Sequence, residues 1–341
     1  MVRWFENLHR DTKMKIIKLF NAKILAFVVM SMFFCFHAYA DNTIVSAPDR
    51  NSFLAEASGS LWKVSENTGE AQRANIGYSM MPSLLVYGNG VYLGYIPMNP
   101  DLIKSSDGMN WKKFTPTIIN APANTSGGAM QNLMFVNGSF YAALAGGTLC
   151  SSSNGLTWNC SEKLPTNRSD TSQVMPCGNK IVSIIQTINS TPSGFMTEEA
   201  IGFSSNGKTW NNISVPYRVD NWSCAGNVIV GIKSSANIMN PKKIVTVISS
   251  GRVITSEPLN HIINNYLGSR NGKILAYGAF DDTVGISTDG GKTFKFQRAE
   301  KTSNILAMTC GKSACLSQAA AGGLDVVLLY SKDAINWHSV R

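Results

Sequence analysis

The chain has 341 residues, and its 30 basic and 21 acidic side chains give a formal net charge of +9. The basic residues neither form a run nor alternate with aromatic residues, so we expect no nucleic-acid partner. The four His residues are scattered and no C-x-x-C pair occurs, so we expect neither a metal site nor a cofactor.

The N-terminus has the three parts of a secretory signal peptide. Four lysines between positions 13 and 23 precede an apolar run at residues 24–36, and Ala38-Tyr39-Ala40 is a small-x-small cleavage site. A membrane anchor is the alternative, but the run is shorter than the ~20 residues that a span needs. We therefore predict a signal peptide at 1–40 and a mature domain at 41–341 without a stable membrane span. Loss of six basic and two acidic residues leaves a net charge of +5, and the protein is expected to be periplasmic or secreted.

One eight-residue stretch organises the mature chain: residues 287–294 read S-x-D-x-G-x-T-F. In a tight hairpin turn, the Ser287 hydroxyl and the Asp289 carboxylate can accept hydrogen bonds from backbone N–H groups. Gly291 supplies a positive φ, Thr293 completes the pattern, and Phe294 begins the next strand and packs on the neighbouring sheet. This stretch builds a fold and performs no chemistry.

Weaker copies of the same turn recur along the chain. Their matching positions are Ser105, Asp107 and Trp111; Ser152, Asn154 and Trp158; Ser204, Asn206 and Trp210; and Ser331, Asp333 and Trp337. Two worn copies begin at Ser65 and Ser249, and the first serines of all seven follow one another at steps of 40, 47, 52, 45, 38 and 44 residues. Such a period, with about four short strands a unit, is typical of a β-propeller.

Within each unit, two apolar strands flank a Gly/Asn turn ahead of the repeated turn, as at Asn137-Gly138 and Asn271-Gly272. We predict an all-β, seven-bladed β-propeller of four-stranded antiparallel blades. Six blades is the alternative if residues 43–77 do not form a complete sheet. We expect a monomer.

Six cysteines remain after the signal, and an even number in an exported chain predicts disulfides. Cys150 and Cys160 flank one of the repeated turns, and Cys310 and Cys315 flank a turn at residues 311–312. Cys177 and Cys224 precede equivalent turns in consecutive repeats, so they are placed to link neighbouring blades. Six cysteines allow fifteen pairings, and the repeat register favours these three.

The five recognisable turns resemble those of the Asp-box (BNR-repeat) propeller superfamily over nearly all of the mature chain. That superfamily includes sialidases, glucan-cleaving glycosidases, sortilin-type receptor propellers and photosystem II assembly-factor-like propellers. The resemblance implies that the turns join the third and fourth strands of each blade, on the rim away from the ligand face. Family membership alone is an analogy for function.

The resemblance raises the possibility of sialidase-type catalysis. Such catalysis uses three arginines, a Tyr nucleophile helped by a Glu, and an Asp acid/base. The Arg-Ile-Pro-like motif that carries the first arginine is missing, since Arg50 and Arg73 both stand in other contexts. We therefore favour a non-enzymatic module that binds a protein or a glycan. A divergent sialidase-like glycoside hydrolase is the alternative, and a purely structural subunit is a third interpretation.

A ligand face, where present, consists of the loops that leave the fourth strands and the loops between second and third strands. Arg-x-Asp occurs twice at equivalent places, and Tyr217 and Trp222 are candidate stacking platforms; the alternative is solvated loops with weak ion pairs. Adjacent carboxylates on a strand point to opposite sides, which argues against a catalytic pair within one doublet. The candidate ligand-binding residues are Arg168, Asp170, Glu198, Glu199, Tyr217, Arg218, Asp220, Trp222, Asp281 and Asp282.

Overall fold

The computed structural model divides the chain into two units, Met1–Ala40 and Asp41–Arg341. It describes residues 43–77, 81–97, 99, 101–121, 130–144, 146–165, 174–191, 194–233, 243–248, 250–279, 281–302, 304–322 and 325–340. The predicted signal peptide lies outside the described residues.

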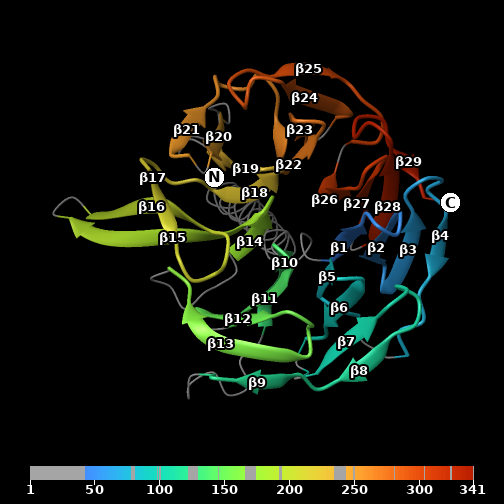
Figure 1. Ribbon diagram of the computed structural model, residues 1–341. Coiled ribbons are helices and arrows are strands. Elements are labelled where there is room, and N and C mark those ends of the chain that lie inside the picture. Colours follow the sequence, from blue (N-terminus) through green and yellow to red (C-terminus); the bar gives the residue numbers. More distant parts are fainter. Residues whose placement is uncertain are drawn as a thin grey trace, which may run out of the picture. The chain divides into compact units, whose positions relative to one another are not determined.

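The second unit is a seven-bladed β-propeller, and each blade is an antiparallel sheet of four strands consecutive in the chain (Figure 1). The strands of blades 1 to 3 are β1 (Ile44–Ala47), β2 (Ser52–Ala57), β3 (Ser60–Ser65), β4 (Ala71–Arg73); β5 (Leu84–Gly88), β6 (Val91–Tyr95), β7 (Leu102–Ser105), β8 (Lys112–Phe114); and β10 (Met130–Val136), β11 (Ser139–Leu144), β12 (Thr148–Ser152), β13 (Thr157–Lys163). Blade 3 gains a fifth strand, β9 (Thr117–Ile119), which pairs with β13 in parallel.

Blades 4 to 7 follow the same order, and the described residues contain no helix. Their strands are β14 (Val174–Cys177), β15 (Lys180–Thr191), β16 (Gly194–Ser204), β17 (Asn211–Val215); β18 (Asn221–Ala225), β19 (Val228–Lys233), β20 (Lys243–Ile248), β21 (Arg252–Thr255); β22 (Ile263–Arg270), β23 (Lys273–Gly278), β24 (Thr283–Ser287), β25 (Lys295–Arg298); and β26 (Ile305–Cys310), β27 (Cys315–Gly322), β28 (Asp325–Ser331), β29 (His338–Ser339). The predicted seven blades are confirmed. The six-blade alternative is wrong, because β1 to β4 form a complete sheet.

Antiparallel order gives the propeller two different faces. Turns between the first and second strands and between the third and fourth strands lie at one end of each blade, which we call the turn face. Connections between second and third strands, and from each blade to the next, lie at the other end, which we call the loop face. All five of the recognisable repeated turns join third and fourth strands and so belong to the turn face.

The core lies between the blades. Six clusters of buried apolar residues each combine side chains from two adjacent blades. In one of them Leu93 of blade 2 and Trp158 of blade 3, 0% and 2% exposed, pack together. Since each fully buried aliphatic side chain contributes about 1.5–3 kcal/mol, these shared clusters make neighbouring blades stabilise one another.

The ring closes without a blade shared between the two ends of the chain, because blade 1 contains only β1–β4 and blade 7 only β26–β29. The Glu66 side chain, from the turn after β3, is fully buried against the β26–β27 turn of blade 7. It accepts hydrogen bonds from the backbone N–H and, at 3.2 Å, the hydroxyl of Ser313. The Tyr330 hydroxyl donates to the Glu66 carbonyl at 2.9 Å. A Cβ at Gly311 would stand 2.4 Å from the Glu66 carboxyl carbon, so a larger residue there would displace the carboxylate from this position.

The three predicted disulfides are confirmed. Cys150–Cys160 joins β12 to β13 within blade 3, and Cys310–Cys315 joins the two strands of the first hairpin of blade 7. Cys177–Cys224 crosses from blade 4 to blade 5. Three disulfides in one chain are typical of an oxidising compartment outside the cytosol.

Candidate functional site

The repeated turns are held by their own side chains. In four of them the serine hydroxyl accepts from the backbone N–H three residues later, as Ser105 does from Gly108 at 2.9 Å. The turn that matches the full pattern has one residue more, and there Ser287 accepts from the N–H of Gly291, four residues later. The Asp or Asn side chain accepts from two consecutive N–H groups in each of the five turns, two and three residues later in the four shorter turns and three and four residues later in the longer one. All these acceptors are occupied within the turn, so the turns serve structure.

These hydrogen bonds favour the ionised form of the turn carboxylates. The backbone N–H of Asn110 holds the pKa of Asp107 far below its usual range, and the Thr293 hydroxyl and N–H do the same for the pKa of Asp289. At Asp333, burial raises the pKa, but hydrogen bonds from the backbone of Asn336 and Ile335 outweigh it and lower the value. The backbone donors of these turns therefore keep the Asp side chains ionised.

The aromatic residue that ends the turn is a core residue. The indole N–H of Trp111, Trp158 and Trp210 donates to the carbonyl of the turn glycine at 2.9–3.2 Å. Blade 7 has Ala334 in place of that glycine, at a φ of +61°. The Tyr277 hydroxyl of blade 6 donates to its carbonyl, and the Trp337 indole N–H has no partner.

On the loop face, Glu199 lies at the centre of a buried polar cluster. It is 2% exposed and is directly opposite Gln186 in the β15–β16 hairpin. Its Oε1 accepts from the Gln186 amide at 2.7 Å, and its Oε2 accepts from the backbone N–H of Val219 and the Trp222 indole N–H at 3.0 and 3.3 Å. Glu199 thus ties the hairpin of blade 4 to the segment that crosses to blade 5.

Burial raises the pKa of Glu199, and the hydrogen bonds from Val219, Gln186 and Trp222 oppose this rise. A carboxyl with a raised pKa in a cleft is a candidate acid catalyst. Here the three donors to the carboxylate belong to blade 4, to blade 5 and to the segment between them, and the neighbouring Glu198 is exposed. The two carboxyls of this doublet therefore lie on opposite sides of β16, as the alternation along a strand predicts.

The segment that crosses from blade 4 to blade 5 contains three of the candidate residues, and a fourth, Trp222, follows it in β18. Trp222 is 6% exposed and part of the core between blades 4 and 5. Tyr217 is half-buried, with the Lys233 ammonium 3.7 Å from its ring centre and its hydroxyl bonded to the Thr255 hydroxyl. Arg218 and Asp220 are exposed. The two predicted stacking platforms thus pack within the protein, and the charged pair faces solvent.

The second carboxylate doublet, Asp281 and Asp282, lies in the bend between β23 and β24 and not in a strand. Asp281 accepts from the Thr283 hydroxyl at 2.7 Å, and Asp282 accepts from the backbone N–H of Thr302 at 2.9 Å. Asp282 thereby fixes the segment that crosses from blade 6 to blade 7. This doublet belongs to blade 6 and Glu198-Glu199 to blade 4, so a whole blade separates them in the ring.

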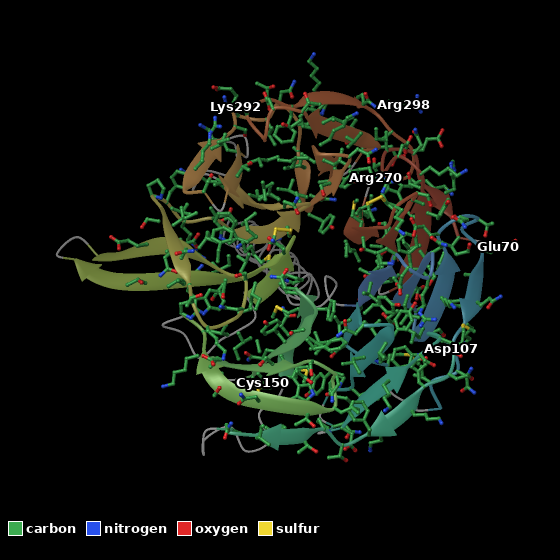
Figure 2. All side chains as sticks on the ribbon, in the orientation of Figure 1. Glu70, Asp107, Cys150, Arg270, Lys292 and Arg298 are labelled. Carbon is green, nitrogen blue, oxygen red and sulfur yellow. A yellow bond between two sulfur atoms is a disulfide. The ribbon has the colours of Figure 1, made fainter. Side chains whose placement is uncertain are left out.

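The arginines of the described residues are spread over several blades. Arg50, Arg252 and Arg270 lie at the turn face, while Arg73 and Arg298 end the outermost strands of blades 1 and 6. Figure 2 shows Arg298 at the periphery and Arg270 nearer the centre. Arg168 and Asp170 lie outside the described residues. No set of three arginines converges in the part of the chain that the structure describes.

Several residues that shape the site carried no signal in the sequence. Gln186 and Val219 complete the Glu199 cluster, yet an isolated Gln in an apolar strand and a Val in a loop are common in most proteins.

The described residues hold no cluster of three or more His, Cys, Asp or Glu side chains placed for a metal ion. Within them no helix has the length and hydrophobicity to cross a membrane.

The fold is similar to that of several solved structures, although the sequence matches no known family. No protein-family model and no curated protein matches the sequence. Among solved structures, YCF48 bound to D1 peptide is similar with a TM-score of 0.56 and 13% identity, over 86% of this chain and 94% of that one. YCF48 from Cyanidioschyzon merolae has a TM-score of 0.53 and 13% identity, over 84% and 94%. Virginiamycin B lyase from Staphylococcus aureus has a TM-score of 0.55 and 10% identity, over 86% and 95%. At these identities the similarity establishes the propeller fold.

Proposed function

We propose that this protein is an exported, non-enzymatic β-propeller that binds a protein or glycan at its loop face. The observation that carries the proposal is the hairpin β15–β16, which extends past its own blade. Its strands pair from Ile181↔Ser204 to Thr191↔Gly194. On one side β14 reaches only as far as Ser183, and on the other β17 reaches only as far as Glu199. We call residues 184–198 the arm; Figure 1 draws it pointing away from the ring.

The arm has the features of a recognition element. Among the described strands, neither β14 nor β17 pairs with the arm, and the edge of a two-stranded ribbon is a place where an extended segment of a partner can add. The Glu199 cluster fixes the base of the arm to the crossing segment of blades 4 and 5, where Arg218 and Asp220 are exposed. A rigid base with exposed charges is the arrangement by which scaffolds present binding loops.

The similar solved structures are compatible with more than one activity. YCF48 appears in complex with D1 peptide, which is a precedent for peptide binding by a propeller of this kind. Virginiamycin B lyase is an enzyme on the same architecture. We favour binding, because the buried acid and the aromatic residues of the loop face are engaged by structural partners.

The test is removal of the arm with the fold retained. Because Thr187 and Glu198 are directly paired, replacing residues 188–197 by Asn-Gly keeps the register through a two-residue turn and leaves Gln186 and Glu199 unchanged. Both proteins are immobilised and incubated with exported proteins, and the bound proteins are then cross-linked in place. Both proteins are also applied in solution to a glycan array. We expect the complete protein to retain a defined partner and the shortened one to lose it. Equal capture by both would refute the role of the arm.

A second assay addresses catalysis. Purified protein with intact disulfides is incubated with mixed sialoglycans beside a known sialidase, and free sialic acid is measured. We expect no release. Turnover would overturn the non-enzymatic proposal and direct mutagenesis to Arg168 and Arg218.

A further inference from the structure

Five Asn-Gly pairs occur in the chain, and this dipeptide has a chemistry of its own. The backbone nitrogen of the residue after an asparagine can attack the side-chain carbonyl carbon, and the side-chain amide is then lost as ammonia. Glycine favours the attack, because it has no side chain beside that nitrogen and lets the backbone turn. The five pairs begin at Asn89, Asn137, Asn154, Asn206 and Asn271, and all of them lie within the described residues.

Two of these pairs belong to the repeated turns and are held at both reacting ends. The side-chain oxygens of Asn154 and Asn206 each accept from two backbone N–H groups. The nitrogens placed to attack, those of Gly155 and Gly207, donate to the serine hydroxyl of their own turn at 2.8 Å. Both glycines are also buried. The reaction is therefore hindered at these two pairs by the same bonds that build the turn.

The other three pairs form one and the same turn, between the first and second strands of their blades. The φ angles of Asn89, Asn137 and Asn271 are +48°, +48° and +50°, and those of the glycines that follow are +74°, +79° and +74°. All three asparagines are exposed. Because backbone geometry and exposure agree, a difference in reactivity among the three arises from the contacts of the side-chain amide.

These contacts differ at blade 6. The Asn89 amide donates to the carbonyls of Gly138 and Ser153 in the next blade, both at 3.0 Å. Asn137 makes the equivalent two bonds to blade 4, both at 2.9 Å. Among the described residues, the Asn271 side chain has no hydrogen-bond partner. Two of the three amides are thus anchored to a neighbouring blade, and the third is not.

The preceding residue, Arg270, explains the difference. The acceptor equivalent to the Gly138 carbonyl is the Lys312 carbonyl of blade 7, since each belongs to the second residue of the next first-to-second strand turn. Arg270 already donates to this carbonyl at 3.2 Å and to the Gly311 carbonyl at 2.7 Å. Arginine therefore makes the contact between blades 6 and 7 that asparagine makes after blades 2 and 3, and Asn271 is left unanchored.

The space around the unanchored pair is open. Asn271 and Gly272 line a cavity of about 480 Å³ beside Arg270, whose walls include the first-to-second strand turns of blades 5, 6 and 7. A Cβ built on Gly272 would meet no atom within 4 Å. Water therefore reaches the pair, and the side chain has room to turn toward the Gly272 nitrogen.

We propose that Asn271 is a modification site, where spontaneous loss of the side-chain amide gives aspartate and isoaspartate. The Gly272 nitrogen forms a bond to the Asn271 Cγ while the bond from Cγ to Nδ2 breaks, and Nδ2 leaves as ammonia with the proton of the Gly272 N–H. Water then opens the resulting cyclic imide at either of its carbonyls. Asparagine and water thus become acid and ammonia, and no oxidant or cofactor is consumed.

The modification changes the turn face and not the loop face or its arm. Either product places a carboxylate in the cavity wall that also contains the basic Arg270 and Lys312. Aspartate fits the left-handed φ of this position, whereas isoaspartate lengthens the backbone of the turn by a methylene group. An exported protein therefore gains negative charge at blade 6 as it ages.

The experiment keeps the full protein, with its disulfides intact, in mildly alkaline buffer made with oxygen-labelled water. Samples are digested at intervals, and incorporation of heavy oxygen is measured in the peptides that contain the five pairs. We expect Asn271 to react about tenfold or more faster than Asn89 and Asn137, because each of these must first break two hydrogen bonds. The control is the reduced protein in guanidinium chloride, where we expect the three rates to become similar because the contacts of the fold are gone.

Two variants locate the product. Asn271→Gln keeps an amide but lengthens the side chain, which disfavours ring closure, and is expected to abolish the acidic species that isoelectric focusing detects on storage. Asn89→Gln makes the same change at an anchored turn in a distant blade and is expected to leave formation of that species within about twofold. Asn271→Asp serves as the reference for its position in the gel.

Equal rates at Asn271, Asn89 and Asn137 in the folded protein would overturn the proposal. An excess at Asn271 that persists unchanged in the unfolded protein would also overturn it, because the neighbouring sequence and not the missing anchor would then set the rate. An acidic species that forms as fast in Asn271→Gln as in the unchanged protein would place the modification elsewhere.

Discussion

One buried side chain, Glu66, contributes to the closure of the ring between blades 1 and 7, and its removal is a sharp test of that contact. Hydrogen bonds from Gln318 to the Thr43 hydroxyl and the Glu56 carbonyl also join the two blades. Glu66 is fully buried, its Oε1 accepts from the backbone and hydroxyl of Ser313, and its Oε2 has no partner. Glu66→Ala removes two hydrogen bonds to a charged acceptor, worth about 1.5–3 kcal/mol each, and leaves the Ser313 N–H unpaired. Relief from burying a carboxylate with one unpaired oxygen offsets part of this loss. We expect a net destabilisation of about 2–4 kcal/mol.

Glu66→Gln separates the two contributions. The amide oxygen keeps the acceptor for Ser313, and the NH₂ group replaces the unpartnered oxygen without a charge. We therefore expect its free energy of unfolding to lie within about 1 kcal/mol of that of the unchanged protein. Glu70→Ala is the control, because Glu70 belongs to the same turn but is exposed (Figure 2), and its expected effect is about 0.5 kcal/mol or less.

The assay is equilibrium unfolding in urea with intact disulfides, followed by tryptophan fluorescence. If Glu66→Ala unfolds at the same urea concentration as Glu70→Ala, Glu66 does not hold blade 1 to blade 7. If Glu66→Gln is as unstable as Glu66→Ala, the charge is required and the offset argued above is wrong.

Three further predictions concern other elements. Asp289→Ala is expected to lose about 1–2 kcal/mol of stability, whereas Asp289→Asn keeps the acceptor and loses less. Because the pKa of Asp289 is lowered in the folded protein, its ionised carboxylate stabilises the fold above the usual carboxyl pKa, and this stabilisation is lost as the pH falls through the lowered value. In thermal unfolding between about pH 2 and 6, the Asn variant should therefore lose less stability on acidification than the unchanged protein. Glu199→Ala leaves donors from two blades unpaired in a buried site and is expected to cost about 2–3 kcal/mol, with Glu199→Gln milder in the same urea assay because the Gln186 amide can turn to accept. The disulfide between Cys177 and Cys224 closes a loop of 47 residues, so the free energy of unfolding of the double Ser variant is expected to be lower by roughly 4 kcal/mol. A urea unfolding midpoint equal to that of the unchanged protein would contradict this.

The number of blades was predictable because the local chemistry of each turn is written in adjacent residues. A serine, an Asp or Asn and a glycine within a few positions can satisfy one another regardless of the rest of the chain, and their spacing counts the blades. The disulfides followed from the same register, because Cys177 and Cys224 stand at equivalent positions of consecutive repeats.

Only the tertiary structure decided which side chains meet across blades. Trp222 and Glu199 looked like ligand residues because aromatic and acidic residues in loops usually face solvent, yet packing between blades 4 and 5 buries both. The partner of Glu66 lies 247 positions away, and no pattern along the chain relates the two. The cavity beside Arg270 likewise depends on three turns that only closure of the ring brings together. Local hydrogen bonding thus determined the repeat, while long-range packing determined the sites, because a site is made of residues that the sequence keeps apart.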